Sequence, residues 1–358
     1  MKSKGIGKII ILALVLVIIG GLLWYFISIG RVSKSDEEIK VEIPLGSGTS
    51  TIADILKENK VIKSKLAFKM YVKINKVKDF QAGTYYLKQN MNVKTIAESL
   101  KTGIVQDPNQ ITLTYLEGKN MRWLAKTIAD KTNNSEDDLF DLLENEEYID
   151  SLIQKYWFLT DEIKDNDIYY SLEGYLFPDT YAFENEDVKV EVIVEKMLDR
   201  MEDILEDYKE EIENGGYNVH KVLTVASIIE MESRSEDGRK DVASVIYNRL
   251  RNNMAIQSDV TTYYAFKVDM GERDLYQKEL NTYNPYNTRG PNMEGKLPIG
   301  PISSVGKSCI DAALNPNETD YLFFVADKNG KLYFSETVSE HNSIVNKLME
   351  DGLWYEYE

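Results

Sequence analysis

Cysteine and histidine are scarce in this sequence of 358 residues, which contains one cysteine, Cys309, and two histidines, His220 and His341. A single cysteine excludes an internal disulfide bond. So few soft ligands also argue against a zinc site. Two histidines leave a Ser-His-Asp triad open by count, but the G-x-S-x-G turn of the α/β hydrolases does not occur. We therefore expect neither a metal site nor a cofactor.

Positive charge is in the minority, with 42 lysines and arginines against 59 aspartates and glutamates and a formal net charge of −17. Such a field repels polyphosphates, so we expect no nucleic-acid partner. Much of the acid is clustered in residues 133–150 and 201–214. Charge runs of this kind are typical of solvated helix faces.

One long hydrophobic run, residues 9–29, contains no charged residue. A helix over this run would be roughly 31 Å long, which matches the ~30 Å hydrocarbon core of a membrane. Because lysines precede it, the sequence predicts a cytoplasmic segment over 1–8, a transmembrane helix over 9–29 and a linker over 30–38. A cleaved signal peptide is the alternative, but the run is too long and no A-x-A site follows. We therefore expect a single-pass protein of the cell membrane, with the remainder outside the cytoplasm.

The segment 39–105 repeats a pattern of a short alternating strand, a polar turn and a helix with an apolar–alanine pair, as in Ile52-Ala53 and Ile96-Ala97. Another helix is expected over 64–75, so the chain from Val41 to Leu87 is expected to run strand–helix–helix–strand. That order resembles a LysM module, a small unit that binds N-acetylglucosamine polymers. A plain α/β scaffold without affinity for sugar is the alternative.

Residues 106–358 are expected to form one larger domain. It contains several helical segments and a stretch rich in Gly, Pro and Asn, residues 281–304, that is expected to consist mostly of turns. A hairpin is expected at Asn329-Gly330. Elements without a βαβ rhythm argue for an α+β fold. The whole chain is therefore predicted to be α+β: an N-terminal transmembrane helix, a small LysM-like α/β module and a larger mixed α+β catalytic domain.

Two glutamates lie near the end of a helical segment that reads "HKVLTVASIIEMES", residues 220–233. On a helical wheel Glu232 falls within the apolar stripe formed by Val225, Ile228 and their neighbours, whereas Glu230 lies about 160° away. Burial raises the pKa of a carboxyl group, and a carboxyl that keeps its proton can act as a general acid. The alternative is that Glu232 ends the helix in solvent. Glu230 is expected to support the site or to lie on the surface.

Several short blocks occur in a fixed order: "TYLEGKNM", "EGYLFPDTYAF", "ASIIEMES", "DVASVIYNRL", "QSDVTTYYA", "YNPYNTRG", "LPIGPISSVG" and "YLFFVAD". Together they resemble the YceG-like family of membrane-anchored murein transglycosylases, from about Gln110 to His341. The resemblance implies that the catalytic residue is the second glutamate of the E-x-E-[ST] block, Glu232, followed here by Ser233. The helical wheel selects the same residue independently.

The resemblance also implies a reaction, the endolytic cleavage of the β-1,4 bond between N-acetylmuramic acid and N-acetylglucosamine in nascent peptidoglycan strands. Protonated Glu232 would donate its proton to the glycosidic oxygen and then accept one from the muramoyl C6 hydroxyl. The product would be a 1,6-anhydro end that terminates strand growth, with no cofactor. The implied partners are the glycan strands and penicillin-binding cell-wall synthases.

Further candidates are polar residues in two of these blocks. The "QSD" block resembles the family's Q-[ST]-D pattern, and amides and hydroxyls suit N-acetyl sugars. The candidate substrate-binding residues are Ser233, Gln257, Asp259, Thr261, Tyr286, Asn287 and Thr288. The alternatives are a helix cap for Asp259 and turn formation for the 286–288 segment.

Other functions and roles remain open from the sequence alone. A hydrolase that uses Asp259 as base beside Glu232 is one alternative function, and a non-catalytic glycan-binding scaffold for synthases is another. The "EGYLFPDTYAF" block, with Glu173 and Asp179, is expected to brace the core. His341 and Asn342 are expected to pack or to cap a helix.

Overall fold

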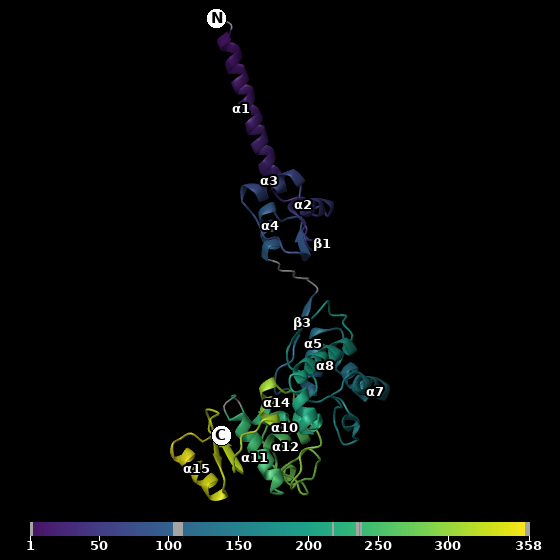
Figure 1. The fold of residues 1–358 in the computed structure, drawn as a ribbon, viewed down its shortest axis with the longest axis vertical. Helices are drawn as coiled ribbons and strands as arrows, with labels where there is room; N and C mark the ends of the chain where they lie inside the picture. Colours follow the sequence, from purple (N-terminus) through teal and green to yellow (C-terminus); the bar gives the residue numbers. More distant parts are fainter. Residues whose placement is uncertain (1–2, 103–109, 217, 234–235, 237, 355–358) are drawn as a thin grey trace. The chain divides into compact units, whose positions relative to one another are not determined.

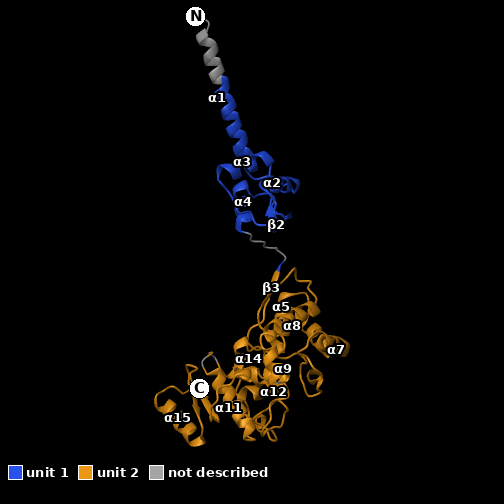
Figure 2. Cartoon of the chain, in the orientation of Figure 1, with its two compact units in different colours: residues 1–110 blue, residues 111–358 orange. Residues whose placement is uncertain are grey.

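The chain forms two compact units in the computed structural model, residues 1–110 and 111–358 (Figure 2). The structure describes residues 3–102, 110–216, 218–233, 236 and 238–354, with only the helical backbone for residues 3–12. The two units are described separately. The predicted boundary between the LysM-like segment 39–105 and the catalytic segment 106–358 stays a prediction, since residues 103–109 lie outside the described residues.

The first unit is built around a two-stranded antiparallel sheet in which Glu38 pairs with Lys88 and Ile43 pairs with Gly83. The order strand–helix–helix–strand predicted for Val41 to Leu87 is confirmed. Ser64 caps the second of these helices by accepting a hydrogen bond from the Ala67 amide. The elements of the unit are α1 (Ser3–Ser28), β1 (Glu38–Ile43), α2 (Thr49–Glu58), α3 (Lys65–Ile74), β2 (Gly83–Lys88) and α4 (Val93–Thr102).

The transmembrane helix predicted over 9–29 requires correction. Among the residues that the structure describes, no helix combines the length and the apolar character that crossing a membrane demands. The side chains that the structure describes in α1 begin at Ala13, so this finding concerns residues 13–28 of the expected span. Residues 9–12 of the expected span, and the segment 1–8 before it, have no described side chains.

The second unit is mixed α+β, as expected for the larger domain, and contains helices with two short antiparallel strand pairs, β3–β4 and β5–β6. The hairpin predicted at Asn329-Gly330 is confirmed as the β5–β6 connection (Figure 1). The elements are β3 (Ile111–Thr114), α5 (Met121–Lys131), α6 (Glu136–Glu144), α7 (Glu146–Lys155), η1 (Asp161–Lys164), β4 (Thr180–Phe183), α8 (Val190–Glu206), α9 (Lys209–Gly215), α10 (Val219–Glu232), α11 (Arg239–Arg251), α12 (Asp259–Ala265), α13 (Gln277–Leu280), α14 (Lys307–Leu314), β5 (Phe323–Ala326), β6 (Leu332–Ser335) and α15 (Val338–Glu350).

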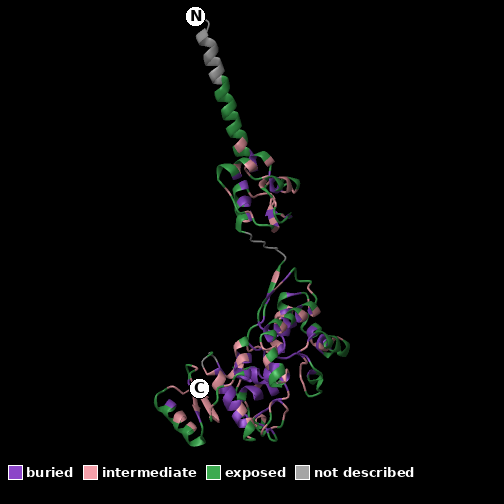
Figure 3. Cartoon of the chain, in the orientation of Figure 1, coloured by how far each residue is buried: buried purple, intermediate pink, exposed green. Residues whose placement is uncertain are grey.

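Helix α10 is the central element of this unit and packs against α11, α12 and α14. At its start, the Asn218 side chain accepts a hydrogen bond from the Lys221 amide. At its end, the Ser233 amide donates a hydrogen bond to the Ile229 carbonyl. Buried residues gather on α10 and α11 (Figure 3). Each large apolar side chain buried there contributes on the order of 1.5–3 kcal/mol to stability, so the position of α10 is firmly fixed. Its last residue, Glu232, is therefore held by the core.

The expected core brace around "EGYLFPDTYAF" is confirmed, because Glu173, Tyr175 and Leu176 are buried. The Glu173 carboxyl accepts a hydrogen bond from the Met121 amide at the start of α5, at 3.0 Å, and another from the Tyr264 hydroxyl of α12, at 3.0 Å. It thus links two helices across the unit. Burial raises the pKa of Glu173 to about 7, although both hydrogen bonds oppose this change.

The raised pKa of Glu173 predicts a pH-dependent stability. Between about pH 4.5 and pH 7 the folded chain keeps a proton that the unfolded chain has lost, so the free energy of unfolding falls as pH rises through this window. The Glu173→Gln variant has no carboxyl to titrate at this position. Relative to it, the free energy of unfolding of the wild-type protein should fall by roughly 3 kcal/mol across the window. Urea unfolding of the full chain, followed by tryptophan fluorescence at several pH values, measures the difference. If the free energy of unfolding changed with pH in the same way for both proteins, the raised pKa of Glu173 would be contradicted.

Candidate active site

Glu232 is held at the C-terminal end of α10 by a hydrogen bond from another part of the chain. The Ser258 hydroxyl donates to Oε1 of Glu232 at 2.6 Å. The helix end is apolar on this side, where Ile228 lines the same cavity as Glu232. The residue is half-buried, so the placement of Glu232 against apolar neighbours is observed and the alternative of a fully solvated side chain is not.

Several opposing effects act on the proton of Glu232. Burial raises its pKa above the usual carboxyl value, and the hydrogen bond from Ser258 opposes the rise by stabilising the carboxylate. The negative charge of Asp259 raises the pKa further, while the positive charge of Arg289 lowers it. Burial wins, so Glu232 keeps its proton to a higher pH than an exposed glutamate does. A proton donor at a cavity wall is what general acid catalysis requires.

The cavity in front of Glu232 has a volume of about 500 Å³. Its lining combines aromatic and apolar residues, several of them from β5 and the C-terminal segment, with polar residues from α10, the start of α12 and the 286–290 turn. Flat apolar faces together with hydrogen-bonding groups suit the ring and the substituents of a sugar. The aromatic and polar residues of the lining include Glu232, Gln257, Asp259, Arg289, Phe323, Phe324, His341 and Trp354.

The loop that delivers Ser258 is held by a compact hydrogen-bond network. The Ser258 amide donates to Thr288 Oγ1 at 3.0 Å, and the Gln257 amide donates to the Thr288 carbonyl at 3.2 Å. Thr261 lies 2.7 Å from Thr288, Oγ1 to Oγ1, and donates to the Ser258 carbonyl. Gln257 has a left-handed backbone with φ of 58°, a conformation that costs energy for a residue with a side chain. The network maintains that turn and thereby the hydrogen bond to Glu232.

Arg249 of α11 joins this loop to the β5–β6 hairpin. Its Nη1 donates to the Ile256 carbonyl at 2.8 Å, and its Nε donates to the Leu322 carbonyl at 2.6 Å. The guanidinium also lies 5.0 Å from the centre of the Phe323 ring. One buried cation therefore fixes the spacing between two walls of the cavity, because its planar fork can serve both segments at once.

Of the substrate-binding residues predicted from the sequence, Gln257 and Asp259 line the cavity together with Glu232. Asp259 forms an ion pair with Arg289, and its side chain is 55% exposed. It does not cap a helix, since Ser258 occupies the position before α12. A role in binding substrate stays a prediction for Gln257 and Asp259.

The other predicted residues are buried in the framework around the cavity. Tyr286 packs between Tyr169 and Tyr264, with both ring centres 4.8 Å away. Asn287 donates to the Thr282 carbonyl and accepts from the Thr262 hydroxyl. Their contacts, like those of Thr261, Thr288 and Ser233, are with the protein itself, and direct contact with substrate stays a prediction.

Glu230 points away from Glu232 and supports the end of α10 from another side. Its side chain is only 6% exposed, and its Oε1 lies 3.6 Å from Nη2 of Arg239. Its Oε2 accepts a hydrogen bond from the Gly306 amide at 2.9 Å, at the N-terminus of α14, where negative charge is favoured. The two glutamates therefore have different environments, as the helical wheel indicates.

The sequence interpretation assigned no place at the cavity to Ser258, Arg249 or Arg289, nor to the lining residues of β5 and the C-terminal segment. Ser258 and Arg289 stand next to predicted residues, so their blocks were noticed and their roles were not. The packing expected for His341 is confirmed, because the centre of its ring lies 5.7 Å from that of Phe323. His341 also lines the cavity, while Thr337 and Glu340 cap α15. Burial lowers the pKa of His341, and in the described structure its buried Nδ1 has no hydrogen-bond partner.

Comparison with known proteins agrees with the blocks noted in the sequence. A protein-family model described as the YceG-like family matches residues 41–347. The chain belongs to the YceG-like family. One family relative is the endolytic murein transglycosylase of Bacillus subtilis (strain 168), which is 39% identical over 333 residues, covering 92% of this chain and 91% of the relative.

Two further relatives of the YceG-like chain span different shares of their own lengths. The endolytic murein transglycosylase of Streptococcus pneumoniae serotype 2 is 29% identical over 325 residues, covering 87% of this chain and 58% of the relative. The crystal structure of a putative yceG-like protein from Listeria monocytogenes is similar with a TM-score of 0.61 and 37% identity, covering 87% of this chain and 100% of that one.

The hydrogen bond between Ser258 and Glu232 predicts a shift in pH dependence. Ser258→Ala removes a donor that stabilises the carboxylate, so the pKa of Glu232 should rise and the alkaline limb of the pH–rate profile should move to higher pH. The maximal rate should fall about tenfold or more because the carboxyl is no longer oriented. Ser343→Ala, at an exposed serine of α15, is the matched control. An alkaline limb that stays in place or moves down would contradict this account.

Proposed function

We propose that this protein is a lytic transglycosylase that cuts the glycan strands of murein internally. The observation that carries the proposal is Glu232, a desolvated carboxyl with a raised pKa that faces a cavity of about 500 Å³. Supporting it are the relatives at up to 39% identity, which are named endolytic murein transglycosylases. The bond cleaved would be the β-1,4 bond between N-acetylmuramic acid and N-acetylglucosamine.

In the first step Glu232 donates its proton to the glycosidic oxygen. The bond between that oxygen and C1 of the muramoyl residue breaks, the N-acetylglucosamine leaves with a hydroxyl, and positive charge develops at C1. Burial serves this step, because a carboxyl that has kept its proton at the working pH can give it up to the leaving group. Ser258, which donates to Oε1, orients the carboxyl and stabilises the carboxylate that remains.

In the second step the Glu232 carboxylate removes the proton from the C6 hydroxyl of the same muramoyl residue. The C6 oxygen attacks C1, which closes a 1,6-anhydro ring and returns Glu232 to its protonated state. Water is not consumed, so the cycle needs one carboxyl, whereas a two-carboxyl hydrolase needs a second to activate or replace water. Asp259, which pairs with Arg289, is in this scheme a charge at the edge of the cavity.

Because murein lies outside the cytoplasm, we propose that residues 111–358 act outside the cytoplasm. Protease treatment of intact cells tests this location.

The strand–helix–helix–strand order of residues 41–87 supports binding of glycan by the first unit. Deletion of 39–105 would then weaken strand binding. The family resemblance supports a partnership with penicillin-binding synthases. A pull-down with the two purified proteins tests whether they bind each other.

The chemistry of the products tests the proposed reaction. Digestion of defined glycan strands by the full chain should give 1,6-anhydro ends in mass spectrometry. Glu232→Gln should lower the rate by about a thousandfold or more, because the amide cannot donate the proton. Asp259→Asn should cut more slowly but still give anhydro ends.

Each of the other outcomes identifies a different function. Reducing ends together with an inactive Asp259→Asn variant would show a two-carboxyl hydrolase. A Glu232→Gln protein that replaces the wild type fully in cells would show a scaffold. A melting temperature of the variant within a few degrees of wild type ensures that lost activity is not lost folding.

A further inference from the structure

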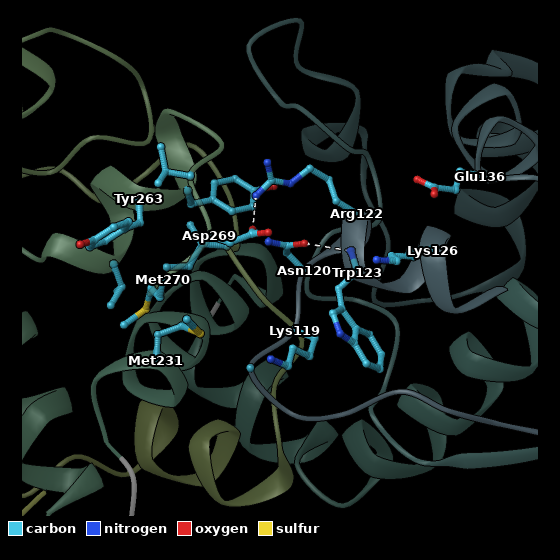
Figure 4. Close-up of a pocket in the computed structure, with 15 residues that line it drawn as sticks. Lys119, Asn120, Arg122, Trp123, Lys126, Glu136, Met231, Tyr263, Asp269 and Met270 are labelled. Carbon is cyan, nitrogen blue, oxygen red and sulfur yellow. Dashed lines mark hydrogen bonds and ion pairs between the residues drawn. The ribbon is translucent and has the colours of Figure 1, made fainter. Parts of the chain in front are cut away.

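A second cavity of about 420 Å³ is shown in Figure 4, and some of its lining residues adjoin in sequence those of the catalytic cavity. Consecutive residues of two helices line different cavities. At the end of α10, Met231 lines the second cavity and Glu232 the first, and at the start of α12 the same holds for Val260 and Asp259. A chain of sugars bound at Glu232 would therefore lie beside residues that adjoin the lining of the second cavity.

The second cavity is positively charged in a chain whose net charge is −17. Arg122 neutralises Asp269, since its Nη2 lies 2.8 Å from Asp269 Oδ1. The remaining ionised groups on the wall are Lys119, Lys126 and the single carboxylate of Glu136. Two lysines in a concave site create a local positive potential. This potential attracts anions, although the net negative charge of the chain repels them elsewhere.

The cavity also has an aromatic and apolar lining. Trp123 stands on the α5 side, and Tyr263, Met231 and Met270 face it across the cavity (Figure 4). The Trp123 ring is fixed by stacking on Tyr115, with ring centres 6.2 Å apart and planes at 20°. A ligand that carries both carboxylates and small apolar groups satisfies this lining better than a bare inorganic anion.

We propose that the second cavity binds an acidic peptide, the stem peptide attached to the strand whose glycan occupies the catalytic cavity. The inference rests on the proposed function, because murein carries its peptides on the muramoyl residue, the sugar that reacts at Glu232. The adjacent lining residues at the end of α10 and the start of α12 bring the second cavity close to the sugar from which this peptide branches. Lys119 and Lys126 bind its carboxylates, and Trp123 and Met270 contact its apolar side chains.

Equilibrium binding of intact strands tests this assignment without turnover. The full chain carrying Glu232→Gln is titrated with peptide-bearing strands and with strands stripped of their peptides. Added Lys119→Gln and Lys126→Gln should reduce the preference for peptide-bearing strands about fivefold, as expected for the loss of two charge-assisted contacts. A higher salt concentration should also reduce the preference of the Glu232→Gln protein for peptide-bearing strands, because salt screens the lysine charges. The control pair, Lys131→Gln and Lys189→Gln, removes two exposed lysines of the same unit and should leave the preference unchanged.

A synthetic tripeptide with two carboxylates, labelled with a fluorophore, separates this inference from the proposed function. Lysine-dependent binding of the tripeptide by a protein that does not cut murein would support the acidic-peptide site and overturn the function. Cleavage with anhydro ends, together with an unchanged strand preference in the Lys119 and Lys126 variant, would overturn the inference alone. Displacement of the tripeptide by equal concentrations of inorganic phosphate would overturn the peptide assignment in favour of a general anion site.

Discussion

The partial removal of one carboxyl group from water controls the chemistry of this site. Glu232 ends a helix whose other faces are buried, and burial raises its pKa because the charged form loses hydration. The hydrogen bond from Ser258 acts in the opposite direction. The balance leaves a proton available for donation while keeping the carboxylate stable enough to exist after donation. An acid that must become a base in the same cycle requires both effects.

The hydrogen bond from Ser258 to Glu232 depends on tertiary structure. Ser258 lies 26 residues beyond Glu232 and is positioned by Thr288, 30 residues further on. Arg249 connects the same loop to the β5–β6 hairpin, which also lines the cavity. Glu230 and Arg239 secure the end of α10 on the far side from the cavity. The catalytic carboxyl is thus oriented from several segments, and its own helix supplies only the apolar surroundings.

The sequence predicted those features that depend on local periodicity. The helical wheel distinguished Glu232 from Glu230, and turn chemistry located the hairpin at Asn329-Gly330. It does not reach contacts between residues far apart in the sequence. The burial of Tyr286, Asn287 and Thr288 comes from partners elsewhere in the fold, and the position of His341 at the cavity comes from the placement of α15. The expected membrane-spanning helix was an inference from hydropathy over a run of which only part has described side chains.

The pKa of Glu232 is the most direct measure of this account. Carbon-13 labelling of glutamate, with Glu232→Gln used to assign the carboxyl resonance, allows an NMR titration of this one group in the full chain. The account predicts a midpoint clearly above 4.5, the ordinary value for glutamate. A midpoint at or below 4.5 would show that Glu232 is a carboxylate at the working pH and would remove it as the proton donor.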